Sequence, residues 1–135
     1  MESKKILLIE DDVFVRDLYR RELQKAGFIV EIGQDGQEGI DRAKSELFDF
    51  LLLDIMLPKK TGIDVLKELK ADPKTRHYPI YLLTNLGQES IIREAIGLGA
   101  IGYLLKAQLL PREVVEAVRK FFEEGPMKID LSQLE

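Results

Sequence analysis

Acidic, hydroxyl and ammonium side chains follow short apolar runs at four places in this sequence. They are Glu10 and Asp11 after the first run, then Asp54, Thr84 and Lys106. Such runs are typical of buried strands, and parallel strands form a ligand crevice at their carboxyl ends. If the four runs are neighbouring strands, these side chains meet in one place. Several carboxylates brought together repel one another, so the site requires a cation or a shared proton.

This set of residue types suits phosphoryl chemistry. Mg²⁺ binds through one or two carboxylates plus phosphate oxygens, so Asp11 and Asp54 could hold it, with Glu10 reaching it through water. An aspartate carboxylate can itself accept a phosphoryl group. Lys106 would then offset charge on the transferring oxygens, and Thr84 would donate a hydrogen bond to them.

Each residue also has a structural explanation when taken alone. Asp11 or Asp12 could cap the helix that follows, since aspartate favours that position. Asp54 could form a turn. Thr84 alone is more simply explained as an ordinary β-branched strand residue, and Lys106 as surface charge. Packing does not explain why all of them stand at successive strand ends.

Apolar runs and amphipathic segments alternate along the chain. The expected strands cover residues 5–10, 28–32, 50–54, 79–84 and 102–106, and the expected helices cover 13–26, 37–46, 63–72, 88–98 and 111–124. Ile40, Ala43 and Leu47 mark the apolar face of the second helix. Five strands each followed by a helix predict an α/β fold, a parallel sheet covered by helices on both faces.

Composition favours one globular domain. The chain has 135 residues, of which 45% are hydrophobic and 33% charged. Its net charge of −4 is spread among interspersed acids and bases, so direct nucleic-acid binding is not expected. There is no cysteine and no secretory signal, and nothing approaches the roughly 20 apolar residues of a membrane span. We therefore expect no membrane partner and a cytoplasmic location.

The domain is expected to end with the last helix. Residues 1–124 form one unit and residues 125–135 a tail, with no output domain apparent. The tail has no strong pattern, and we expect any docking to use its apolar side chains. These are Met127, Ile129, Leu131 and Leu134.

Four motifs give the chain a family likeness over about residues 4–124. They are ILLIEDD at 6–12, LLLDIMLP at 51–58, LLT at 82–84 and GYLLK at 102–106. In this order and at this spacing they resemble the receiver domain of two-component response regulators, in particular the stand-alone chemotaxis regulators. The resemblance implies a flavodoxin-like, doubly wound, three-layer fold with five helices and strand order 2-1-3-4-5, for which a chemotaxis receiver is itself the reference example.

The resemblance also implies a role for each motif residue. It makes Asp54 the phosphoacceptor, Asp11 a direct Mg²⁺ ligand, Glu10 its companion acid, and Met56 the donor of a backbone carbonyl to the metal. Thr84 matches the switch hydroxyl, Lys106 the phosphate-contacting lysine, and Tyr103 an aromatic ring that moves between outward and inward positions. Asp12 is left to cap the first helix. For Tyr103, a half-exposed strand residue is the alternative.

The implied function is a phosphorylation-dependent signalling switch rather than an enzyme with a separate substrate. A histidine kinase or phosphotransfer protein would phosphorylate Asp54, and the chain would promote only its own phosphorylation and dephosphorylation. The change would reach a downstream protein through the fourth helix, fifth strand and fifth helix. Expected contacts there are Arg93, Tyr103, Arg119 and Phe122, with Phe121 in the core and Phe122 exposed. The chain would be a monomer or a weak, phosphorylation-dependent homodimer.

The chain departs from the family pattern in three ways. Ala107 follows Lys106 where the family usually has proline after a cis peptide, and a cis bond before alanine would cost roughly 3–4 kcal/mol. Asn85 replaces a small residue and could narrow access to the phosphorylated aspartate. Lys59 and Lys60 make a loop more basic than usual, and are more simply solvated than involved in binding an acidic partner.

Three other functions remain open at this point. A flavodoxin-like cofactor binder would place glycines and backbone donors after the first strand, where Glu10 would repel a phosphate. A phosphatase with an aspartate nucleophile would need an acid where Met56 stands. The third is a receiver-like interaction module that acts without phosphorylation; the intact acids oppose it, whereas Asn85 and Ala107 favour it.

Overall fold

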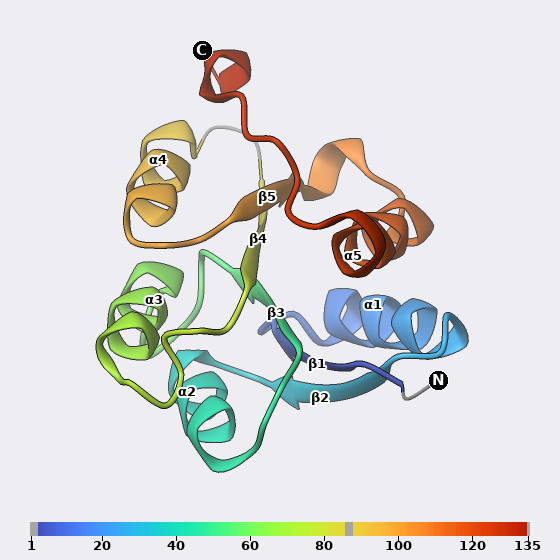
Figure 1. Cartoon of the computed structure of the whole chain (residues 1–135), viewed down its shortest axis with the longest axis horizontal. Helices are drawn as coiled ribbons and strands as arrows, with labels where there is room; N and C mark the ends of the chain where they lie inside the picture. The colour runs from blue at the N-terminus through green and yellow to red at the C-terminus, as the bar shows by residue number, and fades with distance from the viewer. Residues whose placement is uncertain (1–2, 86–87, 135) are drawn as a thin grey trace.

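The chain forms a central sheet between two layers of helices, seen in a computed structural model that describes residues 3–85 and 88–134 (Figure 1). The strands are β1 (Lys5–Ile9), β2 (Ile29–Gly33), β3 (Phe50–Asp54), β4 (Ile80–Thr84) and β5 (Gly102–Leu105). The α-helices are α1 (Val13–Lys25), α2 (Gly36–Ser45), α3 (Gly62–Ala71), α4 (Glu89–Gly97) and α5 (Pro111–Glu124). Short 3₁₀ helices cover Lys106–Gln108 and Leu131–Leu134.

All five strands are parallel, in the order β2-β1-β3-β4-β5. This confirms the α/β class and the order implied by the family resemblance. Helices α2, α3 and α4 cover one face of the sheet, and α1 and α5 cover the other (Figure 1). The carboxyl ends of β1, β3 and β4 therefore open onto the same edge.

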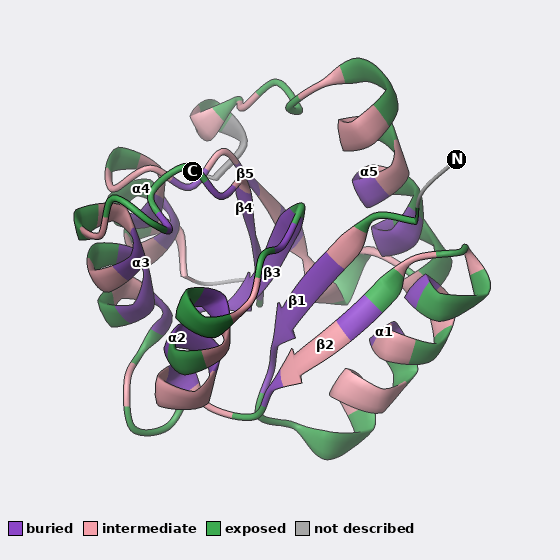
Figure 2. Ribbon diagram, turned by 60° about the horizontal axis from the view of Figure 1, so that its bottom comes forward, coloured by how far each residue is buried: buried purple, intermediate pink, exposed green. Residues whose placement is uncertain are grey.

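The two faces of β1 explain why its run of four apolar residues is unbroken. Leu7 and Ile9 join the core beneath α2 and α3, whereas Ile6 and Leu8 join the core beneath α1 and α5. Strands β1, β3 and β4 are buried throughout most of their length, whereas the edge strand β2 is only partly buried (Figure 2). A strand covered on both faces must be apolar at every position, so the pattern follows from the architecture.

Side-chain caps fix where the helices begin. The Asp12 carboxylate accepts from the backbone N–H groups of Phe14 and Val15 at 2.9 and 3.1 Å, which makes Asp12 the N-cap of α1, as expected. Asp35 caps α2 in the same way, and Thr61 caps α3 with a capping box. These caps position the loops that carry the acids.

Two packing expectations were wrong. Leu47 is 79% exposed, because α2 ends at Ser45 and the extended backbone that follows buries Phe48 instead. Phe122 is not an exposed counterpart of Phe121, because both are partly buried against the same core. The Phe122 ring centroid lies 5.8 Å from that of Phe28, which gives it an aromatic partner.

Gly36 provides a test of packing near the site. A Cβ atom at this position would clash with the backbone carbonyl of Lys60, in the loop that follows β3. We expect Gly36→Ala to lower the free energy of unfolding by about 1–3 kcal/mol, as overpacking does. At Gly97 an added Cβ would meet nothing within 4 Å, so Gly97→Ala should instead stabilise α4 by about 0.5–1 kcal/mol. Urea unfolding of both variants measures these opposite changes in the free energy of unfolding. Equal changes in the two variants would contradict the prediction.

Candidate functional site

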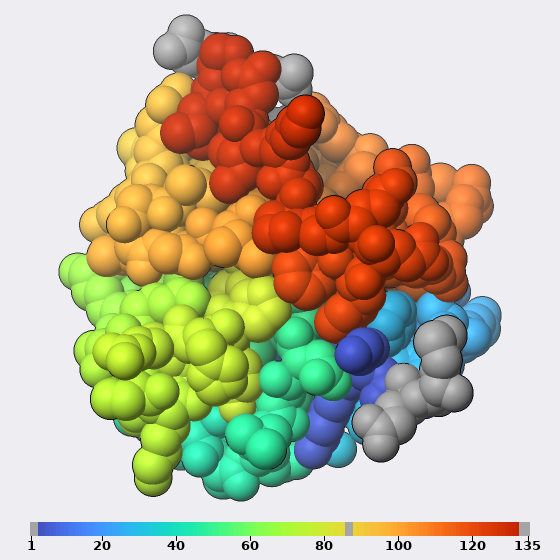
Figure 3. Space-filling model, viewed as in Figure 1, coloured from blue at the N-terminus to red at the C-terminus, as the bar shows by residue number. Residues whose placement is uncertain are grey.

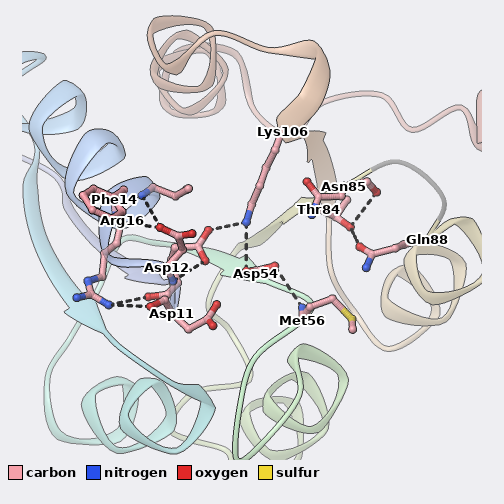
Figure 4. Close-up of polar contacts among 12 residues, drawn as sticks. Asp11, Asp12, Phe14, Arg16, Asp54, Met56, Thr84, Asn85, Gln88 and Lys106 are labelled. Atoms are coloured by element: carbon pink, nitrogen blue, oxygen red, sulfur yellow. Dashed lines mark hydrogen bonds and ion pairs between the residues drawn. The ribbon is translucent and has the colours of Figure 1, made fainter.

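The predicted residues do converge at the carboxyl edge of the sheet (Figure 4). Glu10 and Asp11 follow β1, Asp54 ends β3, and each offers a carboxylate oxygen within 4.8 Å of the others. Glu10 and Asp54 are buried, whereas Asp11 is exposed. Lys106, which directly follows β5, extends its ammonium group into this cluster. Residues far apart in the sequence thus form one compact charged site.

Lys106 joins the two buried acids. Its Nζ atom donates to Glu10 Oε1 at 2.5 Å and to Asp54 Oδ2 at 3.1 Å. The side chains of Glu10 and Asp54 are 1% and 8% exposed, so water screens this triad little. One ammonium cannot neutralise three nearby carboxylates, so the site favours a further cation.

The surroundings of Glu10 and Lys106 shift the pKa values of both side chains. Burial, together with a hydrogen bond to Asp54 and the charge of that residue, raises the pKa of Glu10 above its usual range in spite of Lys106. Burial alone would lower the pKa of Lys106, but its hydrogen bond to Glu10 and the charges of Asp54 and Glu10 raise the pKa. The lysine is therefore cationic at neutral pH, while the folded protein disfavours the charged form of Glu10.

Replacing Glu10 tests this electrostatic conflict. A raised pKa means that the stability contributed by Glu10 is present below its ordinary pKa of 4.5 and is lost as the pH rises through the native value. At neutral pH without Mg²⁺, Glu10→Gln should therefore raise the free energy of unfolding by about 0.5–2 kcal/mol. In urea unfolding experiments, the difference in the free energy of unfolding between Glu10→Gln and the wild type should become smaller as the pH is lowered from 7 to 4.5. A less stable variant at pH 7 would contradict this reasoning.

The loop after β1 is held by a residue that the sequence did not reveal. Arg16, one turn into α1, donates to the backbone carbonyls of Glu10 and Asp11 at 3.2 and 3.4 Å. The Asp12 N–H also donates to Glu10 Oε2 at 3.3 Å. These contacts fix the backbone, while Asp11 itself stays exposed with a carboxylate oxygen within 4.8 Å of the buried acids. An arginine at this spacing from an acidic loop was the signal that could have indicated it.

The loop after β3 holds Asp54 from the other side. The Met56 backbone N–H donates to Asp54 Oδ1 at 3.2 Å, while the Met56 side chain is exposed. Gly62 packs so closely that an added Cβ would lie 2.7 Å from the Asp54 carbonyl oxygen, and its N–H donates to Ile55 at 2.8 Å. Both carboxylate oxygens of Asp54 thus accept a hydrogen bond, one from the Met56 backbone N–H and one from the Lys106 side chain.

Thr84 lies at the same edge of the sheet, but its hydroxyl makes its hydrogen bonds outside the carboxylate cluster. It is fully buried, and its hydroxyl donates to the side-chain oxygen of Gln88, with a second contact of 3.4 Å to the Asn85 carbonyl. Gln88 is the residue from which α4 begins. The sequence analysis did not identify Gln88, because nothing in the pattern links it to Thr84. The Thr84 hydroxyl is thereby connected to the start of α4.

The departures from the family pattern lie around this site. The peptide bond between Lys106 and Ala107 is trans, like every other one in the described residues, and begins a 3₁₀ turn. Asn85 is exposed. Lys59 Nζ lies 3.3 Å from Asp35 Oδ2 and Lys60 pairs with Glu68, so both loop lysines already have acidic neighbours within the chain.

Tyr103 lies on β5, opposite Leu82 of β4. It is partly buried and packs against the core cluster that contains Ile92 and Ala95 of α4. Tyr103 thus lies between solvent and the core, next to the helix that Gln88 begins.

The chain matches a known family over most of its length. Residues 6–119 match the family model described as the response regulator receiver domain. The chain belongs to this family. Receiver domains are the regulated modules of two-component systems, so this assignment makes the chain a signal-transduction protein and confirms the resemblance drawn from the four motifs.

Individual relatives agree with the family. The transcriptional regulatory protein CpxR of Escherichia coli K12 is 39% identical over 115 residues, covering 85% of this chain and 47% of CpxR. The chemotaxis protein CheY of Thermotoga maritima is 32% identical over 120 residues, covering 87% of this chain and 97% of CheY. These matches give no support to an interaction module that acts without phosphorylation.

A solved structure extends the likeness of fold. The receiver domain of the sensor histidine kinase PA1611 from Pseudomonas aeruginosa PAO1, with magnesium in its active-site cleft, superposes with a TM-score of 0.81 at 24% identity, covering 91% of this chain and 100% of that one. This receiver-domain chain spans about half the length of the transcriptional regulators that it matches. None of the helices in its described part is both long and apolar enough to cross a membrane.

Proposed function

We propose that this receiver domain is switched by transfer of a phosphoryl group to Asp54. The observation that carries the proposal is the position of Asp54, which is buried at a strand end, paired with Lys106 and within 4.8 Å of the Glu10 and Asp11 oxygens. A lone structural aspartate would not require an ammonium group and two further acids beside it.

The reaction is a transfer between two nucleophiles. An oxygen of Asp54 forms a bond to phosphorus while the bond from phosphorus to the imidazole nitrogen of a phosphohistidine breaks. The donor is a histidine kinase or a phosphotransfer protein, and the imidazole leaves with the bonding electrons. Lys106 supplies a positive charge beside the accepting oxygen, and the Met56 N–H holds the other oxygen of Asp54. The chain promotes its own phosphorylation and dephosphorylation and acts on no separate substrate.

The acids fit Mg²⁺, which takes oxygen ligands and retains several waters. Asp11, Asp54 and the Met56 carbonyl would hold the ion directly, and Glu10 would reach it through water. The exposed position of Asp11 leaves room for those waters. When bound, the ion supplies positive charge against the phosphoryl oxygens. Magnesium in the cleft of the PA1611 receiver supports the same choice here.

The output follows from the switch hydroxyl. On phosphorylation Thr84 turns toward the new oxygens, and Tyr103 occupies the space it leaves. The surface of α4, β5 and α5 then changes its affinity for a downstream protein. Residues 1–124 are the receiver unit and residues 125–135 a tail. The domain works in the cytoplasm, without direct contact with nucleic acid, as a monomer or a weak homodimer that forms on phosphorylation.

A small phosphodonor tests the proposal without the cognate kinase. We expect the protein incubated with phosphoramidate and Mg²⁺ to gain the mass of one phosphoryl group in an intact-mass time course. Chelation of Mg²⁺ with EDTA should abolish the gain, because the carboxylate cluster would then repel the donor. A second receiver domain treated in parallel shows that the donor is competent. No adduct under those conditions, at any time point, would contradict the proposal.

A further inference from the structure

The chain beyond α5 folds back on the surface assigned above to the downstream protein. At the end of α5, Gly125 adopts a φ of 91°, a left-handed conformation that suits glycine and turns the chain out of the helix. The following segment, Pro126–Ser132, is called here the strap. It runs from α5 across the start of β5 to α4 (Figure 3).

Four contacts hold the strap, two at Met127 and two at Leu131. The Met127 N–H donates to the hydroxyl of the buried Tyr81 at 2.8 Å, and the Met127 side chain lies so close to Gly102 that a Cβ there would be 2.7 Å from its sulfur. Further along, the carbonyl of Leu131 accepts from Arg93 of α4 at 2.9 Å. The Leu131 side chain packs against the core cluster beneath α4. Of the four tail residues expected to dock, Met127 and Leu131 do so, Ile129 is partly buried, and the Leu134 side chain lies outside the described residues.

The strap is held less tightly than the core. Met127 is 36% exposed in spite of its contacts, and the side chains of Pro126, Lys128, Asp130 and Ser132 are exposed as well. A cavity of about 320 Å³ remains between the strap, β4 and α5. A segment with few buried contacts opens at a lower free energy than the sheet, so the strap can leave without unfolding the domain.

A chain of contacts connects the strap to the switch hydroxyl. Thr84 donates its only hydroxyl proton to Gln88, from which α4 begins, and Arg93 on the same helix holds Leu131. If Thr84 donates to a phosphoryl oxygen instead, the Gln88 side chain loses that contact. The start of α4 is then free to shift, and Arg93 shifts with it.

We propose that the strap is an intramolecular occupant of the α4–β5–α5 surface, competing with the downstream protein, and that phosphorylation of Asp54 releases it. This inference rests on the proposed function, because it needs Asp54 to be the phosphorylated residue. Linkage then requires the converse: a change that loosens the strap favours the phosphorylated form, by at most the factor by which phosphorylation loosens the strap.

Hydrogen exchange in the full chain tests the release. Beryllium fluoride with Mg²⁺ serves as the probe for the phosphorylated state. We expect it to accelerate amide exchange of residues 127–132, Met127 included, by about fivefold or more. Leu131→Asp should accelerate the same exchange without the probe and raise the affinity for beryllium fluoride, by no more than the factor by which the probe accelerates exchange in the wild type. Tyr81→Phe, which keeps the ring but removes the acceptor of the Met127 N–H, should act in the same direction.

Leu47→Asp is the matched control, because it makes the same chemical change at a leucine that is 79% exposed and away from the strap. It should leave exchange and beryllium fluoride affinity unchanged. Intact mass first shows whether Asp54 accepts a phosphoryl group. If it does and the probe does not change amide exchange in the strap, the proposed release of the strap is wrong, while the proposed function stands. Absence of any Asp54 adduct would instead overturn the proposed function, and the strap release with it.

Discussion

Asp54→Asn should gain no phosphoryl group from phosphoramidate under conditions in which the wild type is fully modified. The amide has nearly the same shape as the carboxylate but lacks its nucleophilic oxygen. The fold should survive, because Lys106 keeps its hydrogen bond to Glu10 and one of the mutually repelling acids is removed. Intact mass measures the adduct and urea unfolding measures the fold, so loss of chemistry can be separated from loss of structure.

Asp12→Asn is the matched control for this substitution. It makes the same change in an acid of the loop that follows β1, whose carboxylate caps α1 instead of facing Lys106. Asparagine caps helices as well as aspartate does, so both stability and phosphoryl uptake should be retained. An adduct on Asp54→Asn, or its loss in Asp12→Asn, would contradict the assignment of roles.

Lys106→Met should slow adduct formation by about 10²–10³-fold, the effect of removing one preorganised donor from a developing charge. Methionine keeps the length of the side chain but leaves Glu10 and Asp54 buried without a counter-charge. We therefore also expect a loss of about 3–5 kcal/mol in the free energy of unfolding without Mg²⁺, partly restored when Mg²⁺ is added. The adduct time course and urea unfolding with and without Mg²⁺ measure both effects.

Lys60→Met provides the comparison for Lys106→Met. Lys60 pairs with Glu68 in a partly exposed position, outside the carboxylate cluster. Pairs of this kind contribute about 0–1 kcal/mol, so this variant should unfold and take up phosphoryl groups much like the wild type. Equal rates for Lys106→Met and the wild type would show that the ammonium group has no part in the transfer.

The strands and helices could be predicted from the sequence because its short apolar runs were unbroken and alternated with amphipathic segments. Strand β3 and helix α5 have the predicted bounds. Strands β1, β4 and β5 differ from the prediction by one residue at one end, and β2 is shifted by one residue. The strand order came from the family resemblance, because periodicity says which residues are buried and not which strands are neighbours. Leu47 shows the limit of the same pattern: the helical spacing continued past the residue at which α2 ends.

The positions of the site residues could be predicted, but their partners could not. Strand ends bring Glu10, Asp54 and Lys106 together whatever the rotamers are, so their convergence followed from topology. The bond from Thr84 to Gln88 depends on local loop geometry, which no spacing encodes. The spacing of Arg16 from the acidic loop could indicate a contact, but not which backbone carbonyls it reaches. The strap is a further case, since its course depends on the turn at Gly125.

Chemical trapping of the phosphorylated residue is the most direct test of the central claim, that Asp54 is the phosphoacceptor. Borohydride reduces an acyl phosphate to an alcohol and so converts a phosphorylated aspartate into homoserine, which peptide mass spectrometry can assign to one position. After treatment with phosphoramidate, Mg²⁺ and borohydride, we predict homoserine at position 54 and aspartate at positions 11 and 12. Homoserine at any other position, or a phosphoryl adduct that borohydride leaves unreduced, would contradict this account of the site.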